Sequence, residues 1–417
     1  MSQTKGKVSK ALLVFLFQPF LGFLASLRNL DSRAGKFIFV AFATLWGYSQ
    51  SFSYPPADVY RLGAAFCQYG IFEFSTIVNL FREGNILDVY LLLVNYFVHL
   101  FSENAKVFFA VIGLIYGVIC HETLSSLIKE RSNGHNSNLS HILFLMFATA
   151  SLANLSMPRY WTAAWLAAFL FIKMTQGKRK LGWMALLLPF IHFSFAPIAI
   201  ALIIIALFSN LRGKSNSVLF ICVTLMFALS FLLNQTNVAR LIPEEFIEEN
   251  SKIASKLGYV SNETLGIEVV KETSAYREAN NIITNLFHFL MKTGSFLMVL
   301  YFQLRRKIIA NDHKMTITYF GVLIVAFVAY FMSIIPGVGW RYINVLWLVL
   351  YVLLYRYFVV FGTVRSRNLL WLLYGMNIYT IAFMFYVTYR TVDLLLFYAP
   401  LPFVIIHGIG FPPVHFV

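Results

Sequence analysis

The chain has 417 residues, of which 59% are hydrophobic and only 12% are charged, and its formal net charge is +15. A soluble globule of this length needs far more polar surface, so the composition argues against a soluble protein and predicts the lipid bilayer as a partner. The positive charge does not indicate nucleic acid binding, because Lys and Arg are spread over short loops between apolar runs instead of being gathered on one face.

Apolar segments of the length that a membrane helix needs recur from one end of the chain to the other. We predict an all-α polytopic membrane protein with about 11–13 transmembrane or re-entrant helices, folded as a single membrane domain over residues 1–417. In chain order, the apolar segments are 11–27, 37–53, 88–101, 107–127, 142–156, 161–174, 182–209, 217–234, 286–304, 315–335, 343–360, 369–390 and 394–410.

Two of these segments do not fit a simple crossing. Segment 11–27 has basic residues on both flanks, so it either lies in the membrane interface or spans with its Lys-bearing end outside. Segment 182–209 is too long for one crossing and too short for two. Because Pro189 and Pro197 would break a helix there, we predict a re-entrant hairpin whose tip, PFIHFSFAP, holds His192 and faces outward.

The loops between the segments alternate in charge, and this alternation orients the chain. Most Lys and Arg residues fall in the N-terminal tail and in every second loop, which the positive-inside rule places in the cytoplasm. The opposite surface then contains an outer loop with amphipathic helices over 54–106 and a large periplasmic or extracellular loop over 235–285. It also contains the turns 156–160, 336–342 and 390–393, together with the hairpin tip.

Three arginines on this predicted outer surface stand at helix ends, each next to a tyrosine. An arginine close to the bilayer is costly, so its presence requires a reason. One reason is an anion pocket, because guanidinium matches diphosphate or carboxylate with two parallel hydrogen bonds. The alternative is interfacial anchoring by Tyr, Trp and Arg, which is common at helix ends. The pairs are Tyr60–Arg61, Arg159–Tyr160 and Arg341–Tyr342.

Asp58 and His192 are the candidate catalytic residues. Asp58 comes directly before a predicted outer helix, where it could act as general base for a sugar hydroxyl, pair with a pocket arginine or cap the helix. His192 could act as a base or donate to a diphosphate, or it could be a hydrogen-bonded core residue. Arg277, next to Tyr276 in the long outer loop, is a further binding candidate that a solvated helix face also explains.

Motifs of several enzyme classes are absent from the sequence. It contains no DxD that would hold a metal–nucleotide-sugar complex, and no P-loop, HExxH or GxSxG, so an ATPase, a zinc protease and a serine hydrolase are unsupported. The three cysteines, Cys67, Cys120 and Cys222, are scattered without CxxC spacing. We therefore predict neither a metal site nor a cofactor.

The candidate residues fall within short, spaced elements. FATLWGYSQSFSYPPADVYRL contains Asp58, SMPRYWTAAWLAAFLF contains Arg159 at the start of a helix, GKRK is a basic turn, LLLPFIHFSFAPIAIAL contains His192, and WRYINVLWLVL contains Arg341. A helix-opening arginine, a Lys-rich turn and a helix-breaking histidine are typical of the EpsG-like branch of the Wzy-type polysaccharide polymerases. Over most of its length the chain resembles that family of O-antigen or capsule repeat-unit polymerases.

The resemblance implies a C-type, metal-independent membrane glycosyltransferase in the bacterial cytoplasmic (inner) membrane, with its active face periplasmic or extracellular. It would join polyprenyl-diphosphate-linked oligosaccharide repeat units into a surface polysaccharide on the outer leaflet. A base would deprotonate the acceptor hydroxyl, which attacks the anomeric carbon, while arginines stabilise the departing diphosphate. Chain-length regulator and flippase proteins are the implied protein partners.

The residues are also compatible with other functions. An O-antigen-ligase-like transferase would use the same donor with a different acceptor. A lipid-linked glycan flippase or transporter would be expected to carry inverted repeats and polar sites at the membrane midplane, whereas the sequence shows no internal repeat and its outstanding polar residues fall at one face. A membrane acyltransferase would need a His-Asp or similar pair in the membrane, and no such motif occurs.

Overall fold

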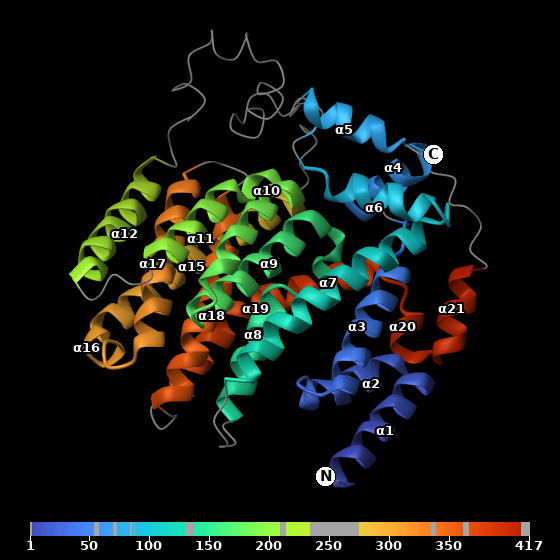
Figure 1. The fold of residues 1–417 in the computed structure, drawn as a ribbon, viewed down its shortest axis with the longest axis horizontal. Helices are drawn as coiled ribbons and strands as arrows, with labels where there is room; N and C mark the ends of the chain where they lie inside the picture. The colour runs from blue at the N-terminus through green and yellow to red at the C-terminus, as the bar shows by residue number, and fades with distance from the viewer. Residues whose placement is uncertain are drawn as a thin grey trace.

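The computed structural model describes residues 2–53, 58–69, 73–83, 86, 88–130, 137–208, 214–233, 275–334, 339–361 and 367–409, and all regular elements in these ranges are helices (Figure 1). Five of them are long and apolar enough to cross a bilayer. The chain is therefore an all-α polytopic membrane protein, and the remaining helices are shorter or more polar than a full crossing requires. The five spans are Ala105–Ile128, Leu139–Ser156, His313–Met332, Gly339–Phe361 and Asn368–Thr391.

The order of helices follows the predicted segments closely in the second half of the chain and less closely in the first. In chain order they are α1 (Ser2–Phe17), α2 (Pro19–Ser26), η1 (Leu27–Asn29), α3 (Arg33–Tyr48), α4 (Asp58–Tyr69), α5 (Phe74–Arg82), α6 (Tyr90–His99), α7 (Ala105–Ile128), α8 (Ser137–Thr149), η2 (Leu152–Ser156), α9 (Pro158–Thr175), η3 (Arg179–Leu187), α10 (Leu188–Ile191), η4 (Phe193–Phe195), α11 (Ala196–Phe208), α12 (Lys214–Leu232), α15 (Ala275–Leu304), α16 (Arg306–Ile309), α17 (His313–Met332), α18 (Gly339–Phe361), α19 (Arg367–Thr391), α20 (Leu395–Tyr398) and α21 (Leu401–Ile409).

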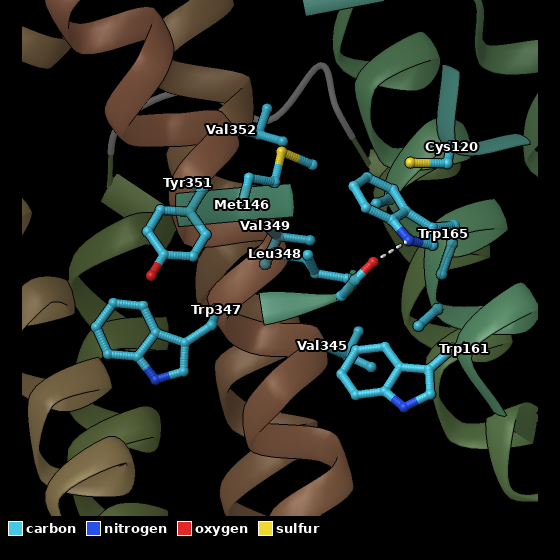
Figure 2. Packing of buried hydrophobic residues seen from close by; sticks show 14 of the residues in the cluster. Cys120, Met146, Trp161, Trp165, Val345, Trp347, Leu348, Val349, Tyr351 and Val352 are labelled. Atoms are coloured by element: carbon cyan, nitrogen blue, oxygen red, sulfur yellow. Dashed lines mark hydrogen bonds between the residues drawn. The ribbon is translucent and has the colours of Figure 1, made fainter. Parts of the chain in front are cut away.

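Helix α18 is the centre of the bundle. It packs against α17, α8, α15 and α9, and Trp347 and Tyr351 on it are almost fully buried (Figure 2). The indole of Trp165 on α9 donates to the carbonyl oxygen of Ala150 at 2.8 Å and to the hydroxyl of Tyr116 at 2.9 Å. Since lipid is as apolar as these side chains, close packing and such interhelical hydrogen bonds, more than exclusion of water, hold the bundle together.

Helices α3 and α7 show how small residues permit close approach. A Cβ on Gly47 would collide with the carbonyl oxygen of Phe109, and one on Gly113 would collide with that of Ala43. Glycine at these two positions lets the backbones come into contact, as small residues commonly do between membrane helices.

The segment predicted at 11–27 is not one crossing helix. Gln18 adopts an extended backbone between α1 and α2, and its side chain accepts a hydrogen bond from the amide of Leu21 at 2.6 Å. Pro19 fills the first turn of α2, where its missing N–H is tolerated. The two helices pack together so tightly that a Cβ on Gly22 would collide with Phe15.

The predicted outer and inner residues gather at different places in the bundle. Helices α4, α5, α6 and α10 lie at one end, and the start of α1 lies at the other (Figure 1). Most of the predicted loop 235–285 lies outside the described residues, which resume at the start of α15.

A buried ion cluster joins helix ends that are predicted to be cytoplasmic. Glu130, just after α7, accepts hydrogen bonds from the Nε and Nη2 of Arg356 at 2.9 and 2.8 Å and pairs with Lys314 at 2.9 Å. Arg356 also donates to the hydroxyls of Thr175 and Thr318 at 2.5 and 2.6 Å. This cluster ties α7, α9, α17 and α18 together.

Candidate anion-binding site at the hairpin break

The segment predicted to be re-entrant is a helical hairpin, and its predicted break at His192 is confirmed. Its two legs, η3 and α11, lie against each other, and a Cβ on Gly182 would meet the Cβ of Ala206 at 2.5 Å. Pro189 and Pro197 lie in the first turns of α10 and α11, where a proline does not remove a helical hydrogen bond. Between these helices His192 has an extended backbone, with φ −153° and ψ 115°.

The local hydrogen bonds fix the imidazole of His192. Its Nδ1 accepts a hydrogen bond from the backbone N–H of Ser194 at 3.3 Å and lies 2.7 Å from the Ser194 hydroxyl. A backbone N–H can only donate, so Nδ1 carries no proton and the ring proton of neutral His192 is on Nε2. In this state Nε2 is a hydrogen-bond donor.

Two tyrosines connect the hairpin to helices α9 and α18. The hydroxyl of Tyr342 on α18 donates to the carbonyl oxygen of Ser194, and the hydroxyl of Tyr160 on α9 donates to the carbonyl oxygen of Arg341. The ring of Tyr160 also lies 6.0 Å from that of His192, centre to centre, at an angle of 85°. Helix α9, helix α18 and the hairpin are therefore held together next to His192.

The side chains of Arg159 and Arg341 are both partly exposed. The Arg341 guanidinium carbon lies 5.8 Å from the ring centre of Tyr160 and, among the described residues, it forms no ion pair with a carboxylate. Arg159 lies in the first turn of α9, whose unpaired backbone N–H groups and dipole favour an anion. Its side chain is 43% exposed. Together with the Nε2–H of His192, these groups can bind an anionic head group.

Asp88 is the residue at this site that we did not predict. The Nη1 of Arg159 donates to both of its carboxylate oxygens, at 2.9 and 3.2 Å. The next residue, Val89, donates its backbone N–H to the carbonyl oxygen of Phe190 in the hairpin, at 2.9 Å. One sequence signal could have identified Asp88, since Asp-Val-Tyr occurs both there and at Asp58.

The other predicted site residues lie on helix α4 or have side chains outside the described part of the chain. Asp58 is the first residue of α4 and pairs with Arg61 one turn along the same helix. Of the three roles considered for Asp58, this contact corresponds to pairing with an arginine. Their side chains are 39% and 69% exposed, and Tyr60 packs partly buried against the core. Arg277 lies in the first turn of α15, but its side chain lies outside the described part of the chain. The structure thus joins Tyr160, His192, Arg341 and Tyr342 through direct contacts, and Arg159 directly precedes Tyr160 on α9. None of the described hydrogen bonds, ion pairs or ring contacts joins Asp58 or Arg61 to them.

A second feature of the site that the sequence did not reveal is the stacking of His288 on Trp340. The two rings lie 5.6 Å apart and nearly parallel, at 7°. Trp340 directly precedes Arg341, so α15 contributes to the packing beside the arginine. No local sequence signal indicates this pairing across distant helices.

In comparisons with known proteins, no family model, no curated protein and no solved structure matches the chain.

Proposed function

We propose that this protein polymerises polyprenyl-diphosphate-linked oligosaccharide repeat units into a surface polysaccharide on the outer leaflet of the bacterial cytoplasmic membrane. The observation that carries the proposal is the set of contacts by which Tyr160, next to Arg159 at the start of α9, meets both Arg341 and His192. Helix α10 of the same hairpin lies at one end of the bundle of apolar helices (Figure 1). A polyprenyl diphosphate places a doubly charged head group at the membrane surface with its chain in lipid. Cationic hydrogen-bond donors at the ends of apolar helices suit both parts of this molecule, because the donors can bind the diphosphate while the polyprenyl chain lies in lipid.

The same groups suit the chemical step of a glycosyl transfer. When the acceptor hydroxyl attacks the anomeric carbon, the bond to the diphosphate breaks and negative charge grows on the departing oxygen. Donors already fixed around that oxygen stabilise the transition state more than the ground state. The hydrogen bonds from Tyr160 and Tyr342 to backbone carbonyls supply this fixation, because they tie α9, α18 and the hairpin to one another.

For the acceptor side of the reaction we propose Asp58 as general base. It lies in the outer layer formed by α4, α5 and α6, at the same end of the bundle as α10 (Figure 1). Its half-exposed carboxylate can accept a proton from a hydroxyl that approaches from the aqueous side. Its pairing with Arg61 holds the carboxylate in place.

A reconstituted assay tests the proposal. Purified protein in liposomes is given a lipid-linked repeat unit, and the glycan length of the products is measured. We expect products of two and more repeat units. We expect Arg159→Lys and Arg341→Lys to lower the rate about tenfold or more at normal protein abundance, because an ammonium cannot reproduce the two-pronged contact of guanidinium.

The matched control is Arg306→Lys, since Arg306 donates to Ser217 at 2.8 Å at a helix end predicted to be cytoplasmic. It should polymerise at the normal rate. Transfer of single units to another acceptor would support the ligase-like alternative, and movement of the lipid without glycan growth would support a flippase. Normal polymerisation by both Arg159→Lys and Arg341→Lys would contradict the proposed role and indicate that these arginines only anchor helix ends in the membrane interface.

A further inference from the structure

We infer that Asp88 is a positioning residue for Arg159, which it holds by one nitrogen so that the rest of the guanidinium is presented to an anionic lipid head group. This inference rests on the proposed function and adds a residue to its binding site. It follows from the direction of the hydrogen bonds, from the exposure of the two side chains and from the attachment of the segment that carries Asp88.

The hydrogen bonds engage only part of the guanidinium. Both bonds from Arg159 to Asp88 leave from Nη1, at 2.9 and 3.2 Å. A fork-to-fork pair would use two nitrogens and would occupy the edge of the guanidinium that binds phosphate. Here Asp88 holds one corner, and neither of its described hydrogen bonds with Arg159 uses the donors on Nη2 and Nε. The 43% exposure of the Arg159 side chain agrees with an accessible outer edge.

The segment that carries Asp88 is itself attached to the hairpin. Val89 donates to the carbonyl oxygen of Phe190 at 2.9 Å, and the rings of Phe81 and Phe190 lie 5.6 Å apart. The carboxylate of Asp88, which is 20% exposed, is thereby fixed relative to both His192 and the start of α9. An arginine side chain has many rotamers, so a fixed partner reduces the conformational entropy that Arg159 loses when it binds a ligand.

Asp88 also has an opposing effect, because its negative charge repels an anion. Two considerations make positioning the larger effect. Arg159 is nearly half exposed, so solvent screens the repulsion between a carboxylate and an incoming phosphate. The loss of a fixed orientation, by contrast, acts directly on the contact with the ligand, where small displacements reduce binding and rate strongly.

Binding of a fluorescent polyprenyl diphosphate without sugar tests the inference directly, using the full-length protein in detergent. Asp88→Ala removes the anchor and should weaken binding about tenfold, which corresponds to about 1.4 kcal/mol. Asp88→Asn keeps an acceptor oxygen at the same place and should bind within about threefold of the unmodified protein. Glu73→Ala, an exposed acid on the same outer layer, is the matched control and should bind normally.

A double-mutant cycle separates positioning from a loss of folding. If Asp88 acts through Arg159, then Asp88→Ala should cause no further loss in an Arg159→Ala background. Equal or tighter binding by Asp88→Ala would overturn the inference and leave Asp88 as a competing counter-ion. An additive loss in the cycle would also overturn it. Absence of binding by the unmodified protein would instead refute the proposed function, on which the inference depends.

Discussion

His192 presents a donor to the site, because its Nδ1 already accepts from the amide of Ser194. At the residue scale, and under the proposed function, this favours the imidazole as a ligand for a phosphate or sugar oxygen over a role as acceptor of the hydroxyl proton. Replacing it with Gln, which retains an N–H donor on a flexible chain, should raise the KM for the lipid-linked donor about tenfold. Turnover at saturating donor should persist.

Steady-state kinetics with the purified protein measure both quantities. An inert His192→Gln variant that still binds the lipid-linked donor normally would contradict this role and make His192 the base.

Asp58 is tested by a comparison with its own partner. Asp58→Asn keeps shape and hydrogen bonding but removes basicity, so turnover should fall about a hundredfold or more while the donor still binds. Arg61→Ala removes the ion pair and leaves the carboxylate, so it should reduce turnover far less. Rates measured at saturating donor decide between them. Equal defects in the two variants would mean that Asp58 serves the structure of α4 through Arg61 and is no base.

At the scale of elements, the buried cluster of Glu130 and Arg356 predicts an acid-sensitive junction between four helices. Burial raises the pKa of the Glu130 carboxyl, but the hydrogen bonds and charge of Arg356, together with hydrogen bonds from Gln176 and Lys314, outweigh burial and bring the pKa below its ordinary value of 4.5. A carboxyl whose pKa is lower in the folded state contributes stability above its unfolded pKa. That contribution is lost as the pH falls through the folded pKa.

We therefore expect the melting temperature of the purified protein to fall on acidification below about pH 4.5. Glu130→Gln leaves the guanidinium of Arg356, which is 2% exposed, without its carboxylate and should cost about 3 kcal/mol at neutral pH. It should also show a smaller acid-dependent fall. The exposed Glu73→Gln should match the unmodified protein at both pH values, whereas an identical acid response in Glu130→Gln would contradict the assignment.

The sequence predicted those elements whose signal is local. A continuous apolar run identified α17 and α18 within a few residues, and two prolines located the break in the hairpin. Segment 11–27 was ambiguous because its apolar content is compatible with one helix, whereas the capping side chain of Gln18 before Pro19 favours two. A cap depends on local hydrogen bonding that average hydropathy does not contain.

The sequence predicted candidate residues for the site but not their contacts. Tyr160, Arg341 and Tyr342 lie together with the hairpin, and arginine and tyrosine at helix ends are visible in the sequence. The partner of Arg159 is 71 positions away along the chain, and the stacking of His288 on Trp340 joins different helices. Such contacts follow from the packing of whole helices, which a single sequence does not specify.

For the molecule as a whole, the proposed function requires the hairpin break to face the outer side of the membrane. Tyr160, Arg341 and Tyr342, which are predicted to be outer, contact one another or the hairpin at His192, and Lys314 and Arg356, which are predicted to be cytoplasmic, pair with Glu130. This segregation agrees with the distribution of basic loops. It also means that one experiment on sidedness tests the topology and the location of the proposed working surface together.

That experiment is thiol labelling of intact cells with a membrane-impermeant reagent, in a Cys67→Ser background because Cys67 is exposed on α4. Single cysteines are placed at three exposed positions: Phe193→Cys beside the hairpin break, Glu73→Cys on α5, and Lys178→Cys in the basic turn after α9. We predict labelling at 193 and 73 in intact cells, and labelling at 178 only after the membrane is permeabilised. Labelling at 178 with protection at 193 and 73 would invert the topology and contradict the account.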